Sequence, residues 1–427
     1  MFQQHGVRSL RSFRPLHQRP PPDLRDLTPL APRPAPPAWP PRSEYGQYDI
    51  PTADVMINFK VGQPAESMLP LDEIRKAAAH KFAETDQLFL QYGFISGYPR
   101  FRRSLATFLS EWYKAPVEAD NLFVTNGVTG GLGLYCMVYA TAGETVFAEE
   151  PTYFLAKAIF ADFGLNVVQI PMDPDGINIE ALEAQLEAGN IPKFLYTIPT
   201  AHNPTGRTMS VAKRAKLVAL GAQYGFHIIA DEVYQLLTFP GVEAPPPLFT
   251  FDDTEDGVVI SLGSFSKILA PALRLGWMEA NPKILKKIFD CGTLDSSGGI
   301  NPVIQGIVHS AIDLGIQAEY LTKTKQTLSD RYSALAAALT EHLPAGTTFE
   351  VPEGGYFVLV QLPEGTDSVA FNNFCQETDK KVMFLPGASF GASYGNFLRL
   401  SFSYYNAADM AVGAERLGKA ITAFLSQ

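Results

Sequence analysis

The chain contains little cysteine, no excess of positive charge and no long apolar run. Its three cysteines, Cys136, Cys291 and Cys375, lie far apart, and no two form a CxxC pair. This disfavours a disulfide scaffold or a metal site and suits a reducing compartment. No apolar run approaches the ~18–20 residues of a membrane-spanning helix. The net charge of −10 argues against a nucleic-acid partner, which would require a basic face.

What is present is typical of a large globular protein. The 427 residues are 46% hydrophobic and 18% charged, which are the proportions of a chain that can bury a sizeable core. A chain of this length is expected to form two domains.

The N-terminal segment differs from the rest of the chain. Residues 1–22 contain four arginines and no Asp or Glu, and residues 20–41 are dense in proline. Proline at this density prevents helices and sheet ladders, so residues 1–45 are predicted to be a disordered leader. An arginine-rich, acid-free start also fits a mitochondrial or plastid transit peptide. Sparse serine and frequent proline favour a plain tail, and thus a cytoplasmic protein.

Beyond residue 46, short apolar runs alternate with amphipathic stretches. Six runs have the length and composition of buried strands: 122–125, 145–148, 167–170, 194–198, 227–230 and 258–262. Between these runs, the stretches 152–163 and 211–224 have the length and the apolar spacing of helices. This alternation predicts an α/β fold with a large three-layer domain, whose mainly parallel sheet is covered on both faces. Ligands of such sheets bind beyond the carboxyl ends of the strands.

The pattern changes after about residue 301. Helical or strand-like patterns continue in five stretches: 301–342, 355–361, 382–385, 397–401 and 407–424. We therefore predict a large cofactor-binding domain at residues 46–310 and a smaller α+β domain at residues 311–427. The order of elements suggests that residues 46–60 pack with the smaller domain.

A group of polar residues follows the last strand predicted in the large domain. Ser264, Ser266 and Lys267 stand in one short loop, shortly before Arg274. Two hydroxyls and a guanidinium can surround a phosphate dianion, and a lysine amine can form a Schiff base with an aldehyde. A lone lysine is most often a solvated surface residue, so this interpretation depends on its neighbours. The group predicts a site for pyridoxal phosphate.

Two further segments supply what the ring of that cofactor needs. Asp231 ends an apolar run, where a carboxylate is costly unless it pairs with a cation such as a protonated pyridine nitrogen. A helix N-cap is the alternative role for this residue. Asn203, in a turn that Pro204 and Gly206 favour, and Tyr234 can both hydrogen-bond the phenolic oxygen.

Other residues fit the same site, each as a weaker signal. Val128 and Thr129 lie in a glycine-rich helix start, where backbone N–H groups bind phosphate. Tyr153 can stack on the ring, and Tyr92 can donate to the phosphate. Arg399 lies in an apolar strand and needs an anion, either a substrate α-carboxylate or a structural acid.

Together these motifs resemble the fold-type-I, pyridoxal-phosphate-dependent aminotransferases of class I and II. The resemblance covers about residues 55–427. It is carried by AHNPTG at 201–206, DEVY at 231–234 and the run at 263–277. That run is most similar to the branch with 2-aminoadipate, kynurenine and aromatic aminotransferases.

The sequence departs from the family pattern at three positions. A hydroxyl is common where Val128 stands, glutamine where Gly130 stands, and glycine where Ala272 stands. Backbone donors survive these changes, and no catalytic group is affected. The departures bear on substrate choice rather than on activity.

The resemblance implies a role for each residue. The implied cofactor-binding set is Tyr92, Val128, Thr129, Tyr153, Asn203, Asp231, Tyr234, Ser264, Ser266, Lys267 and Arg274. The implied substrate-binding set is Gly62, Asn203 and Arg399. Lys267 is implied to be the Schiff-base lysine and proton shuttle, with Asp231 and Tyr234 as the other catalytic residues. Tyr92 is implied to reach the phosphate across a dimer interface, so a homodimer is expected.

The expected reaction is ping-pong transamination between an L-amino acid and a 2-oxo acid. A carbon–sulfur β-lyase or a decarboxylase would use the same cofactor groups, so these alternatives stay open. A non-catalytic regulator domain is a remoter alternative, because it would need a DNA-binding domain that about 45 proline-rich residues cannot form. No second substrate-facing arginine can be assigned, so the sequence does not identify the amino donor.

Overall fold

The computed structural model describes residues 50–85 and 87–427. The leader predicted at residues 1–45, with its transit-peptide alternative, lies outside the described residues. Contacts divide the chain into Met1–Ile50 and Pro51–Gln427, and the second unit is described by itself. Within the described residues, no helix combines the length and hydropathy that are needed to cross a membrane.

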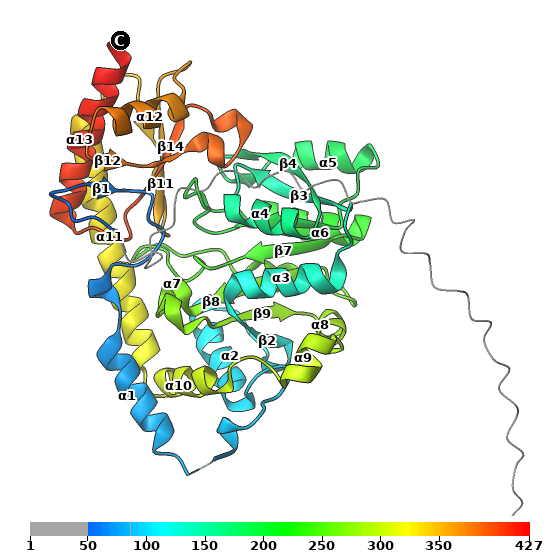
Figure 1. Cartoon of the computed structure of the whole chain (residues 1–427). Helices are drawn as coiled ribbons and strands as arrows, with labels where there is room; N and C mark the ends of the chain where they lie inside the picture. The colour runs from blue at the N-terminus through cyan, green and yellow to red at the C-terminus, as the bar shows by residue number, and fades with distance from the viewer. Residues whose placement is uncertain (1–49, 86) are drawn as a thin grey trace, which may run out of the picture. The chain divides into compact units, whose positions relative to one another are not determined.

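An eight-stranded sheet forms the centre of this unit (Figure 1). Its strands in spatial order are β2 (Leu122–Thr125), β9 (Gly276–Ala280), β8 (Val259–Ser264), β7 (His227–Asp231), β6 (Phe194–Thr197), β3 (Thr145–Glu150), β4 (Asn166–Asp173) and β5 (Gly176–Ile177). The pairs from β8 to β4 are parallel, whereas β9 runs antiparallel to both neighbours and β5 runs antiparallel to β4. The predicted mainly parallel sheet is confirmed.

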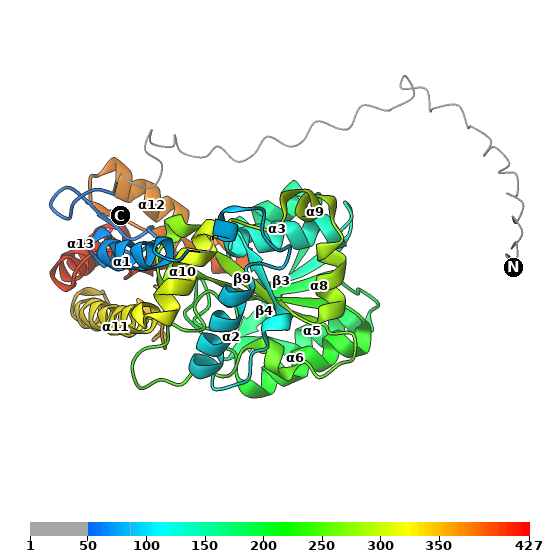
Figure 2. The same ribbon diagram turned by 90° about the horizontal axis from the view of Figure 1, so that it is seen from below.

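Helices cover both faces of this sheet. Figure 2 shows α3 (Gly127–Tyr139) on one side and α5 (Ile179–Glu187) and α6 (Val211–Tyr224) on the other. The helix α6 has the bounds that its spacing predicts, because Ser210 caps its start and Gly225, at φ 74°, ends it in the left-handed conformation.

A four-stranded antiparallel sheet lies in the C-terminal part of the chain. Its order is β10 (Thr348–Phe349), β11 (Phe357–Gln361), β14 (Phe397–Ser401) and β13 (Leu385–Pro386). The nearby helices are α11 (Ile316–His342), α12 (Ser368–Glu377) and α13 (Ala407–Leu425). This sheet with its helices is the smaller α+β part of the predicted fold, and the predicted boundary near residue 310 stays a prediction.

The short strand β1 (Ile57–Asn58) pairs in parallel with β12 (Val382–Met383). The early segment of the chain therefore lies beside elements from the C-terminal part. The remaining helices are α1 (Leu71–Phe82), α2 (Pro99–Tyr113), α4 (Phe154–Asp162), α7 (Phe265–Ile268), α8 (Pro282–Phe289), α9 (Gly292–Ser297) and α10 (Pro302–Asp313).

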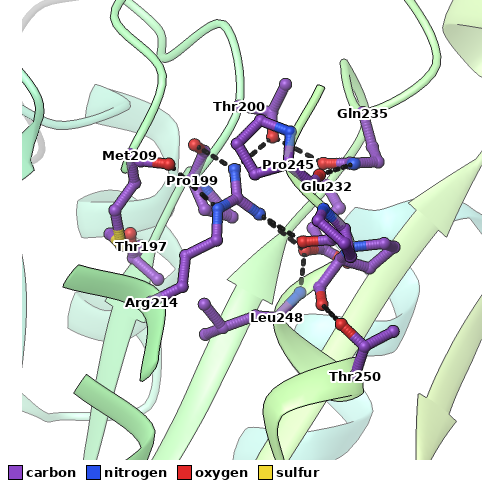
Figure 3. Close-up of polar contacts among 12 residues, drawn as sticks. Thr197, Pro199, Thr200, Met209, Arg214, Glu232, Gln235, Pro245, Leu248 and Thr250 are labelled. Atoms are coloured by element: carbon purple, nitrogen blue, oxygen red, sulfur yellow. Dashed lines mark hydrogen bonds and ion pairs between the residues drawn. The ribbon is translucent and has the colours of Figure 1, made fainter. Parts of the chain in front are cut away.

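A fully buried arginine on α6 ties together the loops that follow β6 and β7 (Figure 3). The guanidinium of Arg214 donates to the carbonyls of Pro199, Met209 and Pro246 and to the hydroxyl of Thr200, at 2.7–3.0 Å. Its Nη1 also lies 3.9 Å from a carboxylate oxygen of Glu232. Because buried carbonyls must be hydrogen-bonded, Arg214 fixes the loops at the carboxyl ends of these strands.

A buried acid in the same sheet should make stability depend on pH. Glu279 on β9 faces Ser261 on β8 and is 3% exposed. Burial, and then repulsion by Glu232, raise its pKa from 4.5 to about 8. The folded state therefore holds a proton that the unfolded chain releases. The stabilisation of the folded state that this proton provides is complete below pH 4.5, and it is lost as the pH rises towards about 8.

We predict that Glu279→Gln removes this dependence, because glutamine has no proton to lose. Between pH 6 and 8 the wild-type free energy of unfolding should fall by up to about 1.4 kcal/mol per pH unit relative to the variant. Urea denaturation across this range would measure the difference. Glu255→Gln, which changes an exposed acid paired with Lys283, is the matched control. Parallel pH profiles for Glu279→Gln and wild type would contradict the prediction.

Candidate active site

The predicted site residues come from segments that are distant in the sequence. Asp231 ends β7, Ser264 ends β8, and α3 begins directly after β2. These are carboxyl ends of strands in the central sheet, the edge at which α/β proteins bind ligands. Arg399 lies on β14 of the smaller sheet.

Lys267 lies on the single-turn helix α7 and is half-buried. Its Nζ donates to the carbonyl of Gly62 at 2.6 Å. Burial, and then the positive charges of Arg399 and Arg274, lower its pKa to about 8, while Asp231 acts in the opposite direction. A substantial fraction of this amine is therefore neutral near physiological pH, as a nucleophile or a base must be.

The backbone of the lysine loop is held by two residues that the sequence analysis missed. Tyr356 donates to the carbonyl of Lys267 at 3.3 Å, and Gln317 donates to the carbonyl of Ile268 at 2.7 Å. A helix as short as α7 leaves its last carbonyls without intrahelical partners, so these bonds fix the lysine's position. Gln317 lies near the start of α11 and had no recognisable motif.

Asp231 is buried, at 5% exposure, and only one of its oxygens has a hydrogen-bond partner in the described part of the chain. Tyr196 donates to Oδ2 at 2.7 Å, while Oδ1 has no partner. Burial raises the pKa of this carboxyl to about 6, and the hydrogen bond from Tyr196 opposes the rise. No helix begins at Asp231, so the N-cap alternative is wrong. An unpaired, buried oxygen here fits the N–H of a protonated pyridine ring.

Hydroxyl, guanidinium and backbone donors gather where a phosphate would bind. Ser266 accepts hydrogen bonds from Ser264 at 3.0 Å and from Arg274 at 3.2 Å. Arg274 also reaches the carbonyl of Asn126, directly before α3. A Cβ on Gly127 would lie 2.8 Å from the guanidinium, so glycine allows this close approach.

The start of α3 completes this arrangement. No side chain caps it, and Val128 and Thr129 contribute two of its first N–H groups. Such N–H groups lack intrahelical partners and carry partial positive charge, so a phosphate satisfies both requirements.

Arg399 is a buried cation without an acidic partner among residues 50–85 and 87–427. It is 3% exposed, and its guanidinium donates to Oδ1 of Asn203 at 3.0 Å and to the carbonyl of Lys60 at 2.8 Å. The guanidinium stacks 3.9 Å from the ring centroid of Phe357, and its Nε has no partner. The structural ion pair considered as an alternative is not formed, so this cation is available for a carboxylate ligand.

Two tyrosines lie close to these charges. Tyr234 is buried, and burial raises its pKa well above the ordinary value, so its phenol remains a donor. Tyr153 is half-buried at the start of α4. Burial, and then the charge of Asp231, raise its pKa to about 12.

Tyr92 is the predicted site residue that the chain does not bring to this group. It is 80% exposed, and its predicted role lies across a dimer interface. Within the described residues, no cluster of three or more His, Cys, Asp or Glu could hold a metal ion.

The donor set fits pyridoxal phosphate at each of the cofactor's polar groups. Lys267 can meet the aldehyde, Asp231 the ring nitrogen, and Ser264, Ser266 and Arg274 the phosphate. Asn203 uses its Oδ1 for Arg399, so its amide N–H groups are left for the phenolic oxygen. Among these groups, the unpaired Oδ1 of Asp231 is the strongest indication of a ligand, because a buried charge without a partner is costly.

Comparison with known proteins agrees with this chemistry. The family model for aminotransferase class I and II matches residues 54–417. The aromatic-amino-acid aminotransferase 1 of Thermococcus litoralis is 34% identical over 381 residues, covering 87% of this chain and 89% of that protein.

Two solved structures of similar proteins contain the cofactor or a derivative of it. The kynurenine aminotransferase of Pyrococcus horikoshii, in complex with PMP, has a TM-score of 0.80 and 31% identity, with coverage of 87% of this chain and 92% of that one. LysN, the α-aminoadipate aminotransferase of Thermus thermophilus, is complexed with N-(5′-phosphopyridoxyl)-L-leucine. It has a TM-score of 0.76 and 29% identity, with coverage of 87% and 93%. The chain thus belongs to the class I and II aminotransferases and is a transaminase that depends on pyridoxal phosphate.

Proposed function

We propose that this transaminase moves the amino group of an L-amino acid with an aromatic, 2-aminoadipate-like or other long side chain to a 2-oxo acid, by a ping-pong sequence. The site assignment depends on three groups whose hydrogen-bonding capacity is incompletely used. These are the amine of Lys267, Oδ1 of Asp231 and Nε of Arg399. Each is complementary to one part of the cofactor–substrate pair.

Each residue of the site has a separate role in the proposed reaction. When bound, the cofactor supplies an aldehyde for Schiff-base formation and a ring that withdraws electrons from the substrate Cα. Lys267, with its lowered pKa, takes the proton from Cα and returns it at C4′. Asp231 holds a proton at the ring nitrogen. Asn203 and Tyr234 donate to the phenolic oxygen, and Arg399 binds the substrate α-carboxylate.

Two buried aromatic rings hold the guanidinium of Arg399, and the proposed class of substrate rests on the relatives. The guanidinium lies 3.9 Å from the ring centroid of Phe357 and 5.3 Å from that of Phe390. The named activities of the relatives, on aromatic amino acids, kynurenine and α-aminoadipate, are consistent with this class. A β-lyase or decarboxylase reaction would use the same cofactor groups, and the donor panel below distinguishes these reactions from amino transfer.

A donor panel tests the proposed substrates. Purified enzyme is given aromatic amino acids, 2-aminoadipate and small amino acids, each with 2-oxoglutarate or pyruvate. Aromatic or long donors should give the highest kcat/KM, and conversion should require the 2-oxo acid. Pyruvate and ammonia formed from a cysteine conjugate without any 2-oxo acid would identify a lyase instead.

We predict that Lys267→Ala reduces turnover by about 10²–10⁴-fold or more, because the site loses its base and its attachment to the cofactor. The visible absorbance of the attached cofactor should disappear, and borohydride should no longer link it to the protein. Lys286→Ala is the control, since that exposed lysine pairs only with Asp290 among the described ion pairs. Full turnover in Lys267→Ala would refute the assignment.

We predict that Arg399→Lys raises KM for both the amino acid and the 2-oxo acid by about tenfold or more, because an ammonium cannot make a bidentate contact with a carboxylate. The absorbance of the attached cofactor should change little. Steady-state kinetics in both directions measure the effect. An unchanged KM for every substrate would show that the α-carboxylate binds elsewhere.

A homodimer is also part of the proposal. Tyr92, Phe94 and Leu90 are 80%, 63% and 62% exposed, a concentration of apolar surface that a partner subunit would cover. Under the proposed arrangement, Tyr92 donates to the phosphate held by the partner.

Subunit mixing would show whether Tyr92 acts across the interface. Lys267→Ala and Tyr92→Ala are both expected to be weakly active alone. A mixed dimer has one complete site, formed by Lys267 of one subunit and Tyr92 of the other. Random exchange should therefore restore about a quarter of the wild-type sites. No recovery after verified subunit exchange would place Tyr92 in the same subunit's site or outside any site.

The compartment is proposed to be the cytoplasm, in keeping with three scattered cysteines. Import into a mitochondrion or plastid is the alternative, should residues 1–45 act as a transit peptide. A fluorescent fusion of these residues distinguishes the two: a diffuse cytosolic signal supports the first, and an organellar signal supports the second.

A further inference from the structure

Tyr196 is a buried residue in contact with Asp231 that has no part in the proposed function above. It lies on β6, beside β7, and is fully buried. Its hydroxyl donates to Oδ2 of Asp231 at 2.7 Å, and its ring packs edge-on against Phe160, with centroids 5.6 Å apart. The phenol therefore has a fixed place and direction.

This hydroxyl keeps its proton near neutral pH and can therefore donate to Asp231. Burial, and then the charge of Asp231, raise the pKa of Tyr196 well above its ordinary value. The phenol thus keeps its proton, and Oδ2 of the aspartate stays occupied. Oδ1 is left as the buried acceptor without a partner in the described chain.

Neighbouring donors on the same segment are used elsewhere. The hydroxyl of Thr197 and the N–H of Ile198 donate to Glu149, at 2.7 and 3.0 Å. His202 also lies against Glu149, with Nε2 3.2 Å from Oε2. Tyr196 is therefore the one side chain of this segment that donates to Asp231 in the described structure, although the N–H of Val233 also lowers the pKa of the aspartate.

We propose that Tyr196 is a positioning residue for transamination: it holds one oxygen of Asp231 so that the other faces the cofactor's ring nitrogen, and so keeps their shared proton on the nitrogen. This inference rests on the proposed role of Asp231. Without the hydroxyl, the carboxylate can rotate and also becomes more basic, because a hydrogen bond to its charged form is lost. Both changes draw the proton away from the ring.

The test compares Tyr196→Phe with wild type, both loaded with ¹⁵N-labelled pyridoxal phosphate. The ring-nitrogen resonance of the variant should move towards that of unprotonated pyridine. The cofactor should bind more weakly to the apoenzyme, and kcat should fall on the order of tenfold to a hundredfold, the range of a hydrogen bond to a charged group. KM for the amino acid should change far less, because Arg399 is untouched.

Tyr135→Phe is the matched control. Tyr135 is also fully buried, and its hydroxyl lies 2.7 Å from Nδ1 of His227, at the opposite end of β7 from Asp231. Its loss should lower stability without moving the ¹⁵N resonance. If Tyr135→Phe shifts the resonance as much as Tyr196→Phe does, the effect is merely structural and the inference is overturned.

A double-mutant cycle shows whether Tyr196 acts through Asp231. Adding Tyr196→Phe to Asp231→Asn should have almost no further effect on kcat, since the carboxylate is already absent. Multiplicative losses would overturn the inference.

3-Fluorotyrosine at position 196 keeps the shape of the residue and strengthens the donor, so it serves where Tyr196→Phe folds poorly. It should keep the resonance at that of the protonated ring nitrogen, and a move towards unprotonated pyridine would overturn the inference. A wild-type protein that shows no attached cofactor or amino transfer would instead refute the proposed function itself.

Discussion

The active site depends on charges that the protein buries without pairing them to one another. Asp231 and Arg399 are each at most 5% exposed, and Lys267 is half-buried between them. Each has hydrogen bonds, yet no Asp or Glu is within ion-pair distance of either cation in the described structure. Burying a charge without a counter-ion is costly, and the folded state must compensate for that cost elsewhere. A ligand with a cationic nitrogen would compensate for the charge of Asp231, and a carboxylate would compensate for that of Arg399.

The segments that carry these charges are supported by buried polar contacts elsewhere in the fold. Arg214 joins α6 to the loops after β6 and β7 through bonds to backbone carbonyls. Glu149 does the same for β6, accepting from Thr197 and Ile198. These contacts are themselves buried and polar, so breaking one would leave several groups unsatisfied. The segments that carry Asn203 and Asp231 are thereby held in fixed positions relative to the sheet.

The sequence predicted the parts of this arrangement that depend on local pattern. The helix at 211–224 and the strand at 397–401 have the predicted bounds, because each is delimited by clear capping or burial. The strand β9 was missed, since Gly276–Ala280 begins inside the run at 263–277, which was interpreted only for its chemistry. The positions of Lys267, Asp231 and Asn203 at one sheet edge follow from strand order. In contrast, Tyr196, Gln317 and Tyr356 act through contacts between segments far apart in the chain, and no local pattern distinguishes them from ordinary core residues.

The same electrostatics allow Lys267 to change its basicity during the reaction. In the free protein, Arg399 and Arg274 lower the pKa of its amine, and Asp231 raises it. A carboxylate bound at the buried Arg399 would neutralise the stronger of the two cations that oppose protonation. The field of a charge in a region of low dielectric is strong, so neutralising it has a large effect on a neighbouring amine. With the proposed roles, the lysine would be the better nucleophile while the carboxylate position is empty and the stronger base once a substrate carboxylate occupies Arg399. In that scheme, substrate binding and proton transfer would be coupled through charge.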